Sequence, residues 1–417
     1  MSLLISAARN RLLEWGRWSV LLCLFSVPIN KPATNISIFL ALLCTLLGSR
    51  ARERFQNAAR QPVVIGAGIW FLVLALSAMH ASAEAAPWLT LSSYIGLLYP
   101  LIVASLLETP QWRKRGLFAF AAAASLIMLV SWAQFAGLMP LLNGAGKPLA
   151  YRYTVFKDYT QQGIVFLVLA TMAASFAKAE TNIKLQRLFW LLASAAFLNV
   201  LFLLQSRTAY LVAAPLLLYW VWRFAGGRQA GWRGAMIGML ALTLIGSAAL
   251  LAPGVQQRFE QTLQDVSLYT ERHAATSMGI RLELWQRPLP IIAAAPLFGH
   301  GLGQWRVEYQ NQTKALTNFS AFRMGHPHQE ALYILSEQGI AGLVLFGFLL
   351  LKLARYIARL EPPYRDFYTC LLFIYLTAGL ANCILQDFSH RHVFLMLLAC
   401  IPFVPQPVRL QIRPVVA

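Results

Sequence analysis

Long apolar runs alternate with short polar connections along the whole chain. The run from Leu117 to Trp132, for example, contains no charged residue. A helix needs about 20 mostly apolar residues to cross a bilayer, so runs of this kind predict membrane spans. About twelve spans are predicted, at residues 13–30, 34–49, 63–82, 88–108, 116–138, 160–178, 185–205, 208–224, 234–253, 329–352, 367–386 and 388–405. The pattern therefore predicts an all-α, polytopic integral membrane protein.

The composition supports this prediction. Of the 417 residues, 58% are hydrophobic and only 12% are charged, whereas an ordinary soluble domain has roughly 25% charged residues. The net charge of +19 is high enough to suggest a nucleic-acid partner. However, the basic residues lie between apolar runs and form no contiguous patch, so we expect no nucleic-acid binding.

The basic residues also predict which side of the membrane each loop faces. Most of the 35 Lys and Arg residues lie in alternate short loops, starting with Arg9, Arg11 and Arg17 near the N-terminus. Such an excess is typical of cytoplasmic loops. Both termini are therefore expected in the cytoplasm, and the N-terminus shows no signal-peptide cleavage site.

One long connection interrupts the series of spans and short loops. Residues 1–253 and residues 329–417 hold the predicted spans, whereas residues 254–328 form a mostly polar segment on the predicted outer side. Apolar residues recur at helical spacing over Val255–His273 and Ile280–Ile292, so this segment is predicted to be a helical cap on the membrane.

Two histidines open the span that is predicted at residues 329–352, in the sequence His326-Pro327-His328-Gln329. In a continuous helix, His328 and Leu335 would share one face with both glycines of Gly339-Ile340-Ala341-Gly342. Glycines at this spacing allow another helix or an apolar chain to approach closely. The helix dipole would disfavour imidazolium at His328, as a general base requires. The alternative is that both histidines are interfacial polar residues that cap a helix.

Two arginines are candidates for binding an anion on the outer side. Arg207 lies in Gln205-Ser206-Arg207-Thr208, between two predicted spans, and Arg281 lies at the start of a predicted helix in the long segment. The first turn of a helix favours anions, and a guanidinium binds a diphosphate through paired hydrogen bonds. Alternatively, Arg207 extends to water at the membrane boundary, and Arg281 forms an ion pair with Glu283 or a neighbouring acid.

A weaker candidate is the basic and aromatic stretch that contains Arg152 and Lys157, in the predicted outer loop 139–159. Most such stretches are interfacial anchors. The sequence contains no nucleotide-binding loop, no serine-hydrolase elbow and no zinc-protease motif. No metal and no cofactor are therefore expected. Intramembrane acids are few, which argues against an ion-coupled transporter.

The spacing of the histidine and glycine motifs resembles the signature of O-antigen ligases: His328-Gln329, nine residues, then Gly339-x-x-Gly342. The length, the number of predicted spans and the long segment before the motif resemble the same family. Arg207 and Arg281 match its essential arginines by motif context and topology. The resemblance implies a catalytic His328 and a donor diphosphate bound by the two arginines. His326, Gln329 and Glu330 are weaker candidates, and Gly339 and Gly342 are structural.

The resemblance also implies a reaction. O-antigen polysaccharide would be transferred from undecaprenyl diphosphate to lipid A–core oligosaccharide at the periplasmic face of a Gram-negative inner membrane. The enzyme would be inverting and metal-independent and would contact membrane lipids. One alternative is an O-antigen polymerase, which would lengthen the glycan on the same lipid-linked donor. Another is a flippase or exporter that moves polysaccharide or lipid without chemistry.

Overall fold

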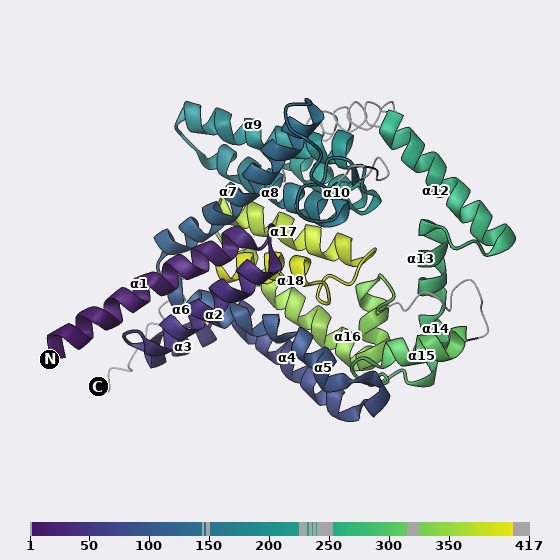
Figure 1. Ribbon diagram of the computed structural model, residues 1–417, viewed down its shortest axis with the longest axis horizontal. Coiled ribbons are helices and arrows are strands. Elements are labelled where there is room, and N and C mark those ends of the chain that lie inside the picture. The colour runs from purple at the N-terminus through teal and green to yellow at the C-terminus, as the bar shows by residue number, and fades with distance from the viewer. Residues whose placement is uncertain are drawn as a thin grey trace, which may run out of the picture.

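The computed structural model describes residues 2–143, 146, 151–224, 232, 236, 239, 253–314 and 325–402. In this part of the chain every regular element is a helix (Figure 1). The first are α1 (Ser2–Ser26), α2 (Lys31–Leu47), α3 (Ala51–Ala59), α4 (Pro62–His80), η1 (Ala83–Ala85), α5 (Pro87–Ser93), η2 (Ile95–Leu98), α6 (Tyr99–Leu106) and α7 (Pro110–Phe135). Next come α8 (Tyr159–Ala179), α9 (Ile183–Asn199), η4 (Val200–Leu204) and α10 (Arg207–Phe224). The last are α12 (Pro253–Arg272), α13 (Ser277–Gln286), α14 (Pro288–Ala294), α15 (Gln304–Thr313), α16 (Glu330–Ile357), α17 (Tyr364–Gly379) and α18 (Phe388–Ala399).

The helices lie where the apolar runs predicted them. Six helical segments are long and apolar enough to cross a membrane, namely Pro62–His80, Ala83–Leu106, Pro110–Phe135, Tyr159–Ala179, Ile183–Leu204 and Glu330–Ile357. The pair α2–α3, bent by 119°, would be a seventh. The chain is therefore an all-α polytopic membrane protein. The span predicted at 234–253 lies almost wholly outside the described residues, and the total of twelve stays a prediction.

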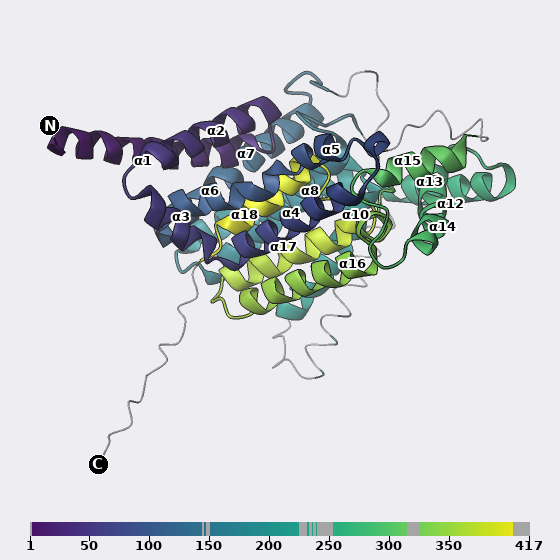
Figure 2. The ribbon, with the colours of Figure 1, turned by 90° about the horizontal axis from the view of Figure 1, so that it is seen from below.

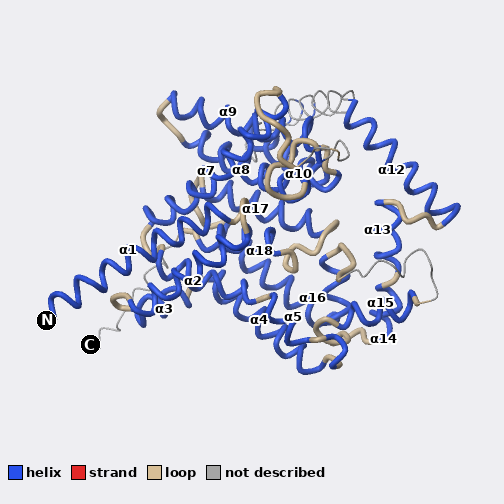
Figure 3. Tube along the Cα trace, viewed as in Figure 1, coloured by secondary structure: helices blue, strands red, loops and turns tan. Residues whose placement is uncertain are grey.

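Helices α12–α15 form a lobe at one end of the bundle. Figure 2 shows this lobe on the right and the N-terminus on the left, and Figure 3 shows α12 and α13 standing apart from the bundle helices. Loops that were predicted to share a side meet at the lobe end: Ser82, after α4, donates a hydrogen bond to Gln304 of α15 (2.8 Å). We call this end of the molecule the lobe end.

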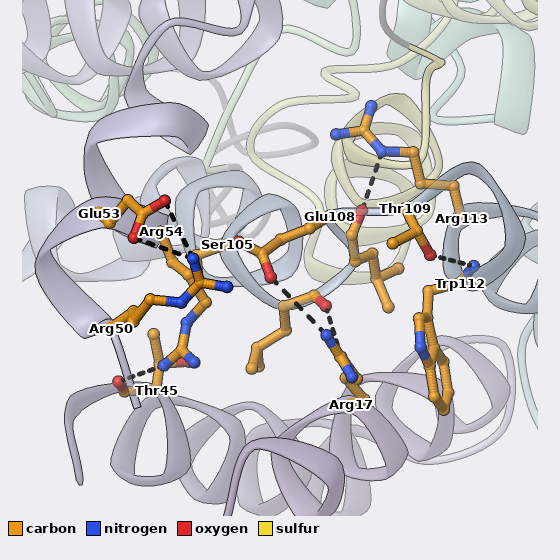
Figure 4. Close-up of polar contacts among 12 residues, drawn as sticks. Arg17, Thr45, Arg50, Glu53, Arg54, Ser105, Glu108, Thr109, Trp112 and Arg113 are labelled. Carbon is orange, nitrogen blue, oxygen red and sulfur yellow. Dashed lines mark hydrogen bonds and ion pairs between the residues drawn. The ribbon is translucent and has the colours of Figure 1, made fainter. Parts of the chain in front are cut away.

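The loops predicted to be cytoplasmic meet at the opposite end. Figure 4 shows a polar cluster there, in which Arg17 of α1 lies 3.7 Å from the carboxylate of Glu108, between α6 and α7. Arg54 of α3 donates to the carbonyl of Thr45 in α2 (2.9 Å). Helix α4 connects the two ends. These contacts place the loop after α4 at the lobe end and the region of Arg17, Arg54 and Glu108 at the other end. The side of the membrane that each loop faces stays a prediction from the basic residues.

The longest helix, α16, is broken at Gly339, where φ is 65° and ψ is −167°. The segment 295–303, which joins α14 to α15, enters this break. Four backbone hydrogen bonds of 2.8–3.0 Å fill it, from the N–H groups of His300, Gly301, Ile340 and Ala341 to the carbonyls of Ser336, Glu337, Pro296 and Leu297 respectively. The backbone groups that the break removes from the helix are therefore satisfied by another part of the chain.

The break overturns the predicted helix face. Helix α16 begins at Glu330, and its N-cap Gln329 accepts the N–H of Leu332. His328 precedes the cap, with a φ of 52°. His328 therefore does not lie on one face of a continuous helix with the two glycines. A Cβ on Gly339 would lie 2.4 Å from the backbone of Leu297, within the inserted segment.

Gly342 also has a different role from the predicted contact with a neighbouring helix. A Cβ there would lie 2.3 Å from the Cβ of Gln338, on the other side of the break in the same helix. Gly342 therefore makes room for the bend. It also lines an apolar cavity of about 470 Å³ between α4 and α16, together with Leu76 and Phe298.

We predict that Gly339→Ala destabilises the protein. The methyl group would clash with Leu297 and would hold a non-glycine residue at positive φ, which costs roughly 1–3 kcal/mol before the clash is counted. The melting temperature in detergent should therefore fall. Gly347→Ala is the matched control, because this glycine of α16 has open space around its Cβ position and alanine favours helix. Equal melting temperatures for the two variants would contradict the assignment.

Candidate functional site

The two histidines lie together at the lobe end. The backbone N–H of His328 donates to Nδ1 of His326 (3.2 Å), and the two rings pack edge to face with centroids 4.4 Å apart. Nδ1 of His328 lies 3.2 Å from Oδ1 of Asn382, which belongs to the connection 380–387 between α17 and α18. Neither ring caps α16, since Gln329 does so. The alternative of two capping histidines is therefore wrong.

Burial keeps both imidazoles neutral. It lowers the pKa of His328 below the ordinary 6.5, and the charge of Arg281 lowers this pKa further, although the hydrogen bond with Asn382 opposes the shift. The pKa of His326 falls to about 3, through burial and the proximity of His328. The helix dipole, on which the sequence prediction relied, is not the main cause, because His328 lies before the first turn. A neutral His328 is able to accept a proton.

Arg207 is placed by an irregular turn between α9 and α10. The π-helix η4 ends at Leu204, and its C-cap Gln205 has a φ of 44°. The hydroxyl of Ser206 accepts the N–H of Ala209 (3.3 Å), so α10 begins at Arg207. The guanidinium lies 3.0 Å from the carboxylate of Asp265 in α12, and the Arg207 side chain is only 19% exposed. Arg207 therefore does not extend freely to water, as the alternative required.

Arg281 lies in the second turn of α13 and is half-buried. Burial lowers its pKa, Tyr159 opposes this shift, and the charge of Arg207 adds to it. Arg281 in turn lowers the pKa of His328. Arg281 therefore lies within electrostatic range of both Arg207 and His328, although the three residues come from α13, α10 and the segment before α16. That they form one functional site stays a prediction.

Glu283 does not neutralise Arg281. It is buried and accepts a hydrogen bond from the hydroxyl of Tyr269 (2.7 Å), and it forms an ion pair with Arg287 (2.5 Å). The predicted alternative, a pair with Glu283, is therefore wrong. Among the described residues no carboxylate forms an ion pair with Arg281, which leaves this cation available to an anionic ligand.

Asp265, which the sequence prediction missed, occupies the start of α13. Its Oδ2 accepts from Arg207 and also from the N–H of Met278 (3.3 Å). The predicted anion site in the first turn of this helix is thus filled by a carboxylate of the chain. Nε of Arg207 is buried and has no hydrogen-bond partner within the described ranges, so Arg207 keeps a donor beyond those that Asp265 uses.

Asp387 connects the histidines with the shorter outer loop. It caps α18, accepts from the amide of Gln161 (3.0 Å) and raises the pKa of His326. It also acts on Lys157, whose pKa is lowered by burial and by Lys31. Lys157 therefore lies at the edge of the site.

The other weak candidates have different surroundings. Arg152 is exposed, and its guanidinium lies 5.9 Å from the ring centre of Tyr153. No contact among the described residues joins Arg152 to the histidines. Glu330 is buried and accepts the N–H of Leu385 (3.1 Å). It therefore holds the connection 380–387 in place.

Three residues of this site had no motif in the sequence: Asp265, Asn382 and Asp387. Asn382 gave one signal, because it is an amide within the span predicted at 367–386, and polar groups at membrane depth are often functional. Asp387 lies where two predicted spans meet. Asp265 gave none, because acids are common on the polar face of an amphipathic helix.

The fold and the site define a helical membrane protein with two arginines beside a neutral histidine at one end. Residues 192–347 match the family model described as O-Antigen ligase. The match runs from α9 to α16 and includes Arg207, Arg281 and His328. This part of the chain is therefore similar to the O-antigen ligase family.

One curated relative also matches part of the chain. This protein, from Haemophilus influenzae, is described as uncharacterized and is 28% identical over 119 residues. The matched stretch covers 26% of this chain and only 29% of the relative. The relative therefore supports a local similarity and adds nothing about activity.

We predict that ¹⁵N NMR of histidine-labelled protein finds His328 neutral at pH 6.5, with a titration midpoint below that value. The sign follows from its lowered pKa: protonation requires a lower pH than in a free imidazole. Arg281→Gln should raise the midpoint, since it removes a positive charge. Arg287→Gln is the control, because Arg287 pairs with Glu283. A midpoint at or above 6.5 in the wild-type protein would contradict the described electrostatics.

Proposed function

We propose that this protein transfers O-antigen polysaccharide from undecaprenyl diphosphate to lipid A–core oligosaccharide, at the periplasmic face of the inner membrane. The observation that carries the proposal is that Arg281 lies within electrostatic range of both Arg207 and His328, although the three residues come from separate elements. The match of residues 192–347 to the O-antigen ligase family model supports it.

The arginines would bind and stabilise the leaving group. A sugar on a lipid diphosphate is already activated, so the site needs no nucleotide. Negative charge grows on the diphosphate as the bond to the sugar breaks, and fixed guanidinium groups stabilise that charge. Arg281, which lacks a carboxylate partner among the described residues, and the remaining donors of Arg207 suit this task.

His328 would act as the general base. Its neutral imidazole would take the proton of an acceptor hydroxyl while that oxygen attacks the anomeric carbon. Attack from the side opposite the departing diphosphate would invert the configuration of that carbon. The apolar cavity beside the break in α16 has room for a hydrocarbon chain of a lipid substrate.

The decisive experiment supplies the purified protein with a lipid-linked glycan and lipid A–core. Capped lipopolysaccharide together with free undecaprenyl diphosphate is the expected result. A longer glycan that stays on its lipid carrier would instead identify a polymerase, which the superfamily also includes. Movement of the lipid-linked glycan across the membrane of a proteoliposome, without chemistry, would identify a flippase or exporter.

We predict that Arg207→Lys and Arg281→Lys each raise the KM for the lipid-linked donor. A lysine keeps the charge but loses the planar pair of donors, and the loss of a charge-assisted hydrogen bond is worth roughly 10- to 100-fold. Arg287→Lys is the matched control on α13, because a lysine there can still pair with Glu283. Wild-type KM in both site variants would refute the assignment.

We predict that His328→Ala lowers transfer by about 10²–10⁴-fold, as the loss of a general base does, while the affinity for the donor is kept. In the wild-type protein, activity should fall only as the pH drops below the ordinary imidazole range, because the pKa of His328 is lowered. The residual activity of the variant should lack this acid limb. An unchanged acid limb would show that another group is the base.

A further inference from the structure

The side-chain amide of Asn382 faces Nδ1 of the His328 ring. Oδ1 of Asn382 lies 3.2 Å from Nδ1. We propose that Asn382 is a positioning residue that holds the proton of His328 on Nδ1 and so presents Nε2 to the acceptor hydroxyl. The inference rests on the proposed function and adds a residue that lies outside the stretch matched by the family model.

The hydrogen bonds determine the state of each ring. An amide oxygen only accepts hydrogen bonds, so Nδ1 of His328 must carry a hydrogen and Nε2 must carry the lone pair. His326 has the complementary state, because its Nδ1 accepts the backbone N–H of His328 and so carries no hydrogen. Within the described residues Nε2 of His328 has no hydrogen-bond partner. It is therefore the nitrogen available to a substrate.

The connection 380–387 is held firmly enough to orient a side chain. Leu385 is fixed from both sides: its N–H donates to Glu330 (3.1 Å), and its carbonyl accepts from Nη1 of Arg391 (2.8 Å). Arg391 also donates to the carbonyl of Ser93 (2.5 Å), which anchors the connection to the end of α5. A buried acid and a buried arginine on either side of one backbone residue thus fix the loop that carries Asn382.

The neutrality of Asn382 matters because of the charges around His328. Arg281 faces the imidazole from α13, and His326 faces it from its own segment. Asp387 acts on His326, and the carboxylate of Glu330 is used by Leu385. A carboxylate at position 382 would attract a proton to His328 and would compete for Arg281. An amide orients the ring without either effect.

The proposed step balances in atoms and charge. The hydroxyl proton of the acceptor moves to Nε2 of His328, and the hydroxyl oxygen forms a bond to the anomeric carbon. The bond between that carbon and the diphosphate oxygen breaks, and its electron pair leaves with the diphosphate. His328 becomes an imidazolium with a hydrogen on each nitrogen, and it is restored when it releases the proton to water. Throughout the step, Oδ1 of Asn382 accepts a hydrogen bond from the N–H at Nδ1.

The test compares Asn382→Ala with Asn382→Asp in the purified full-length protein. Asn382→Ala should lower kcat by roughly 10- to 100-fold, as the loss of an orienting partner does, with little change in the KM for the donor. Asn382→Asp keeps the acceptor oxygen and adds a negative charge that stabilises imidazolium. Its acid limb should therefore move to higher pH by about 1–2 units, with kcat at saturating donor retained above that limb.

Two controls separate positioning from a general structural effect. Asn143→Asp adds the same charge to an outer-loop amide that contacts the carbonyl of Val155 and neither histidine, so its acid limb should match that of the wild type. ¹⁵N NMR of the wild-type protein should show the hydrogen of His328 on Nδ1, and Asn382→Ala should lose this preference. This measurement needs no activity, so it distinguishes failure of the inference from failure of the proposed function. A hydrogen on Nε2, or an acid limb that does not move in Asn382→Asp, would overturn the inference.

Discussion

A backbone hydrogen-bonding group in a bilayer must find its partner within the protein, and this constraint shapes the whole molecule. Helix α16 breaks at Gly339, and the segment 295–303 supplies the four hydrogen bonds that the helix loses there. The same segment joins α14 to α15 and is therefore part of the lobe (Figure 2). The break thus fixes the lobe to the bundle, and with it the position of Arg281 relative to His328.

The charges at the lobe end are arranged so that the base and the anion site do not neutralise each other. Arg207 has a carboxylate partner in Asp265, whereas Arg281 has none among the described residues and adds to the burial that lowers the pKa of His328. Among the described residues, the groups that form hydrogen bonds with the two imidazole rings are an amide and a backbone N–H. The acids nearby are engaged elsewhere: Glu283 with Tyr269 and Glu330 with Leu385. A cationic site and a neutral base can therefore stand side by side.

The sequence predicted the helices well because each span is a local property of about 20 residues. It also singled out Arg207, Arg281 and His328, since arginines beside apolar spans and a histidine before a span are visible locally, and their roles stay predictions. It failed where distant segments meet. The continuous helix face was wrong because Gly339 takes its conformation from contact with Leu297, and helical periodicity carries no information about such a contact. Asp265 and Asn382 were missed for the same reason, because only the folded chain brings them to their partners.

Asp265 gives the site a built-in competitor. Its carboxylate occupies both Arg207 and the first turn of α13, so Arg207 does not lie bare beside a membrane that contains many anionic headgroups. A tethered carboxylate has a high effective concentration. A bound anionic ligand would therefore need more than one negative charge, or a contact with Arg281 as well, to displace the carboxylate of Asp265 from Arg207. Under the proposed function, the internal carboxylate would discriminate against monoanions such as a simple phosphodiester lipid and would favour a diphosphate.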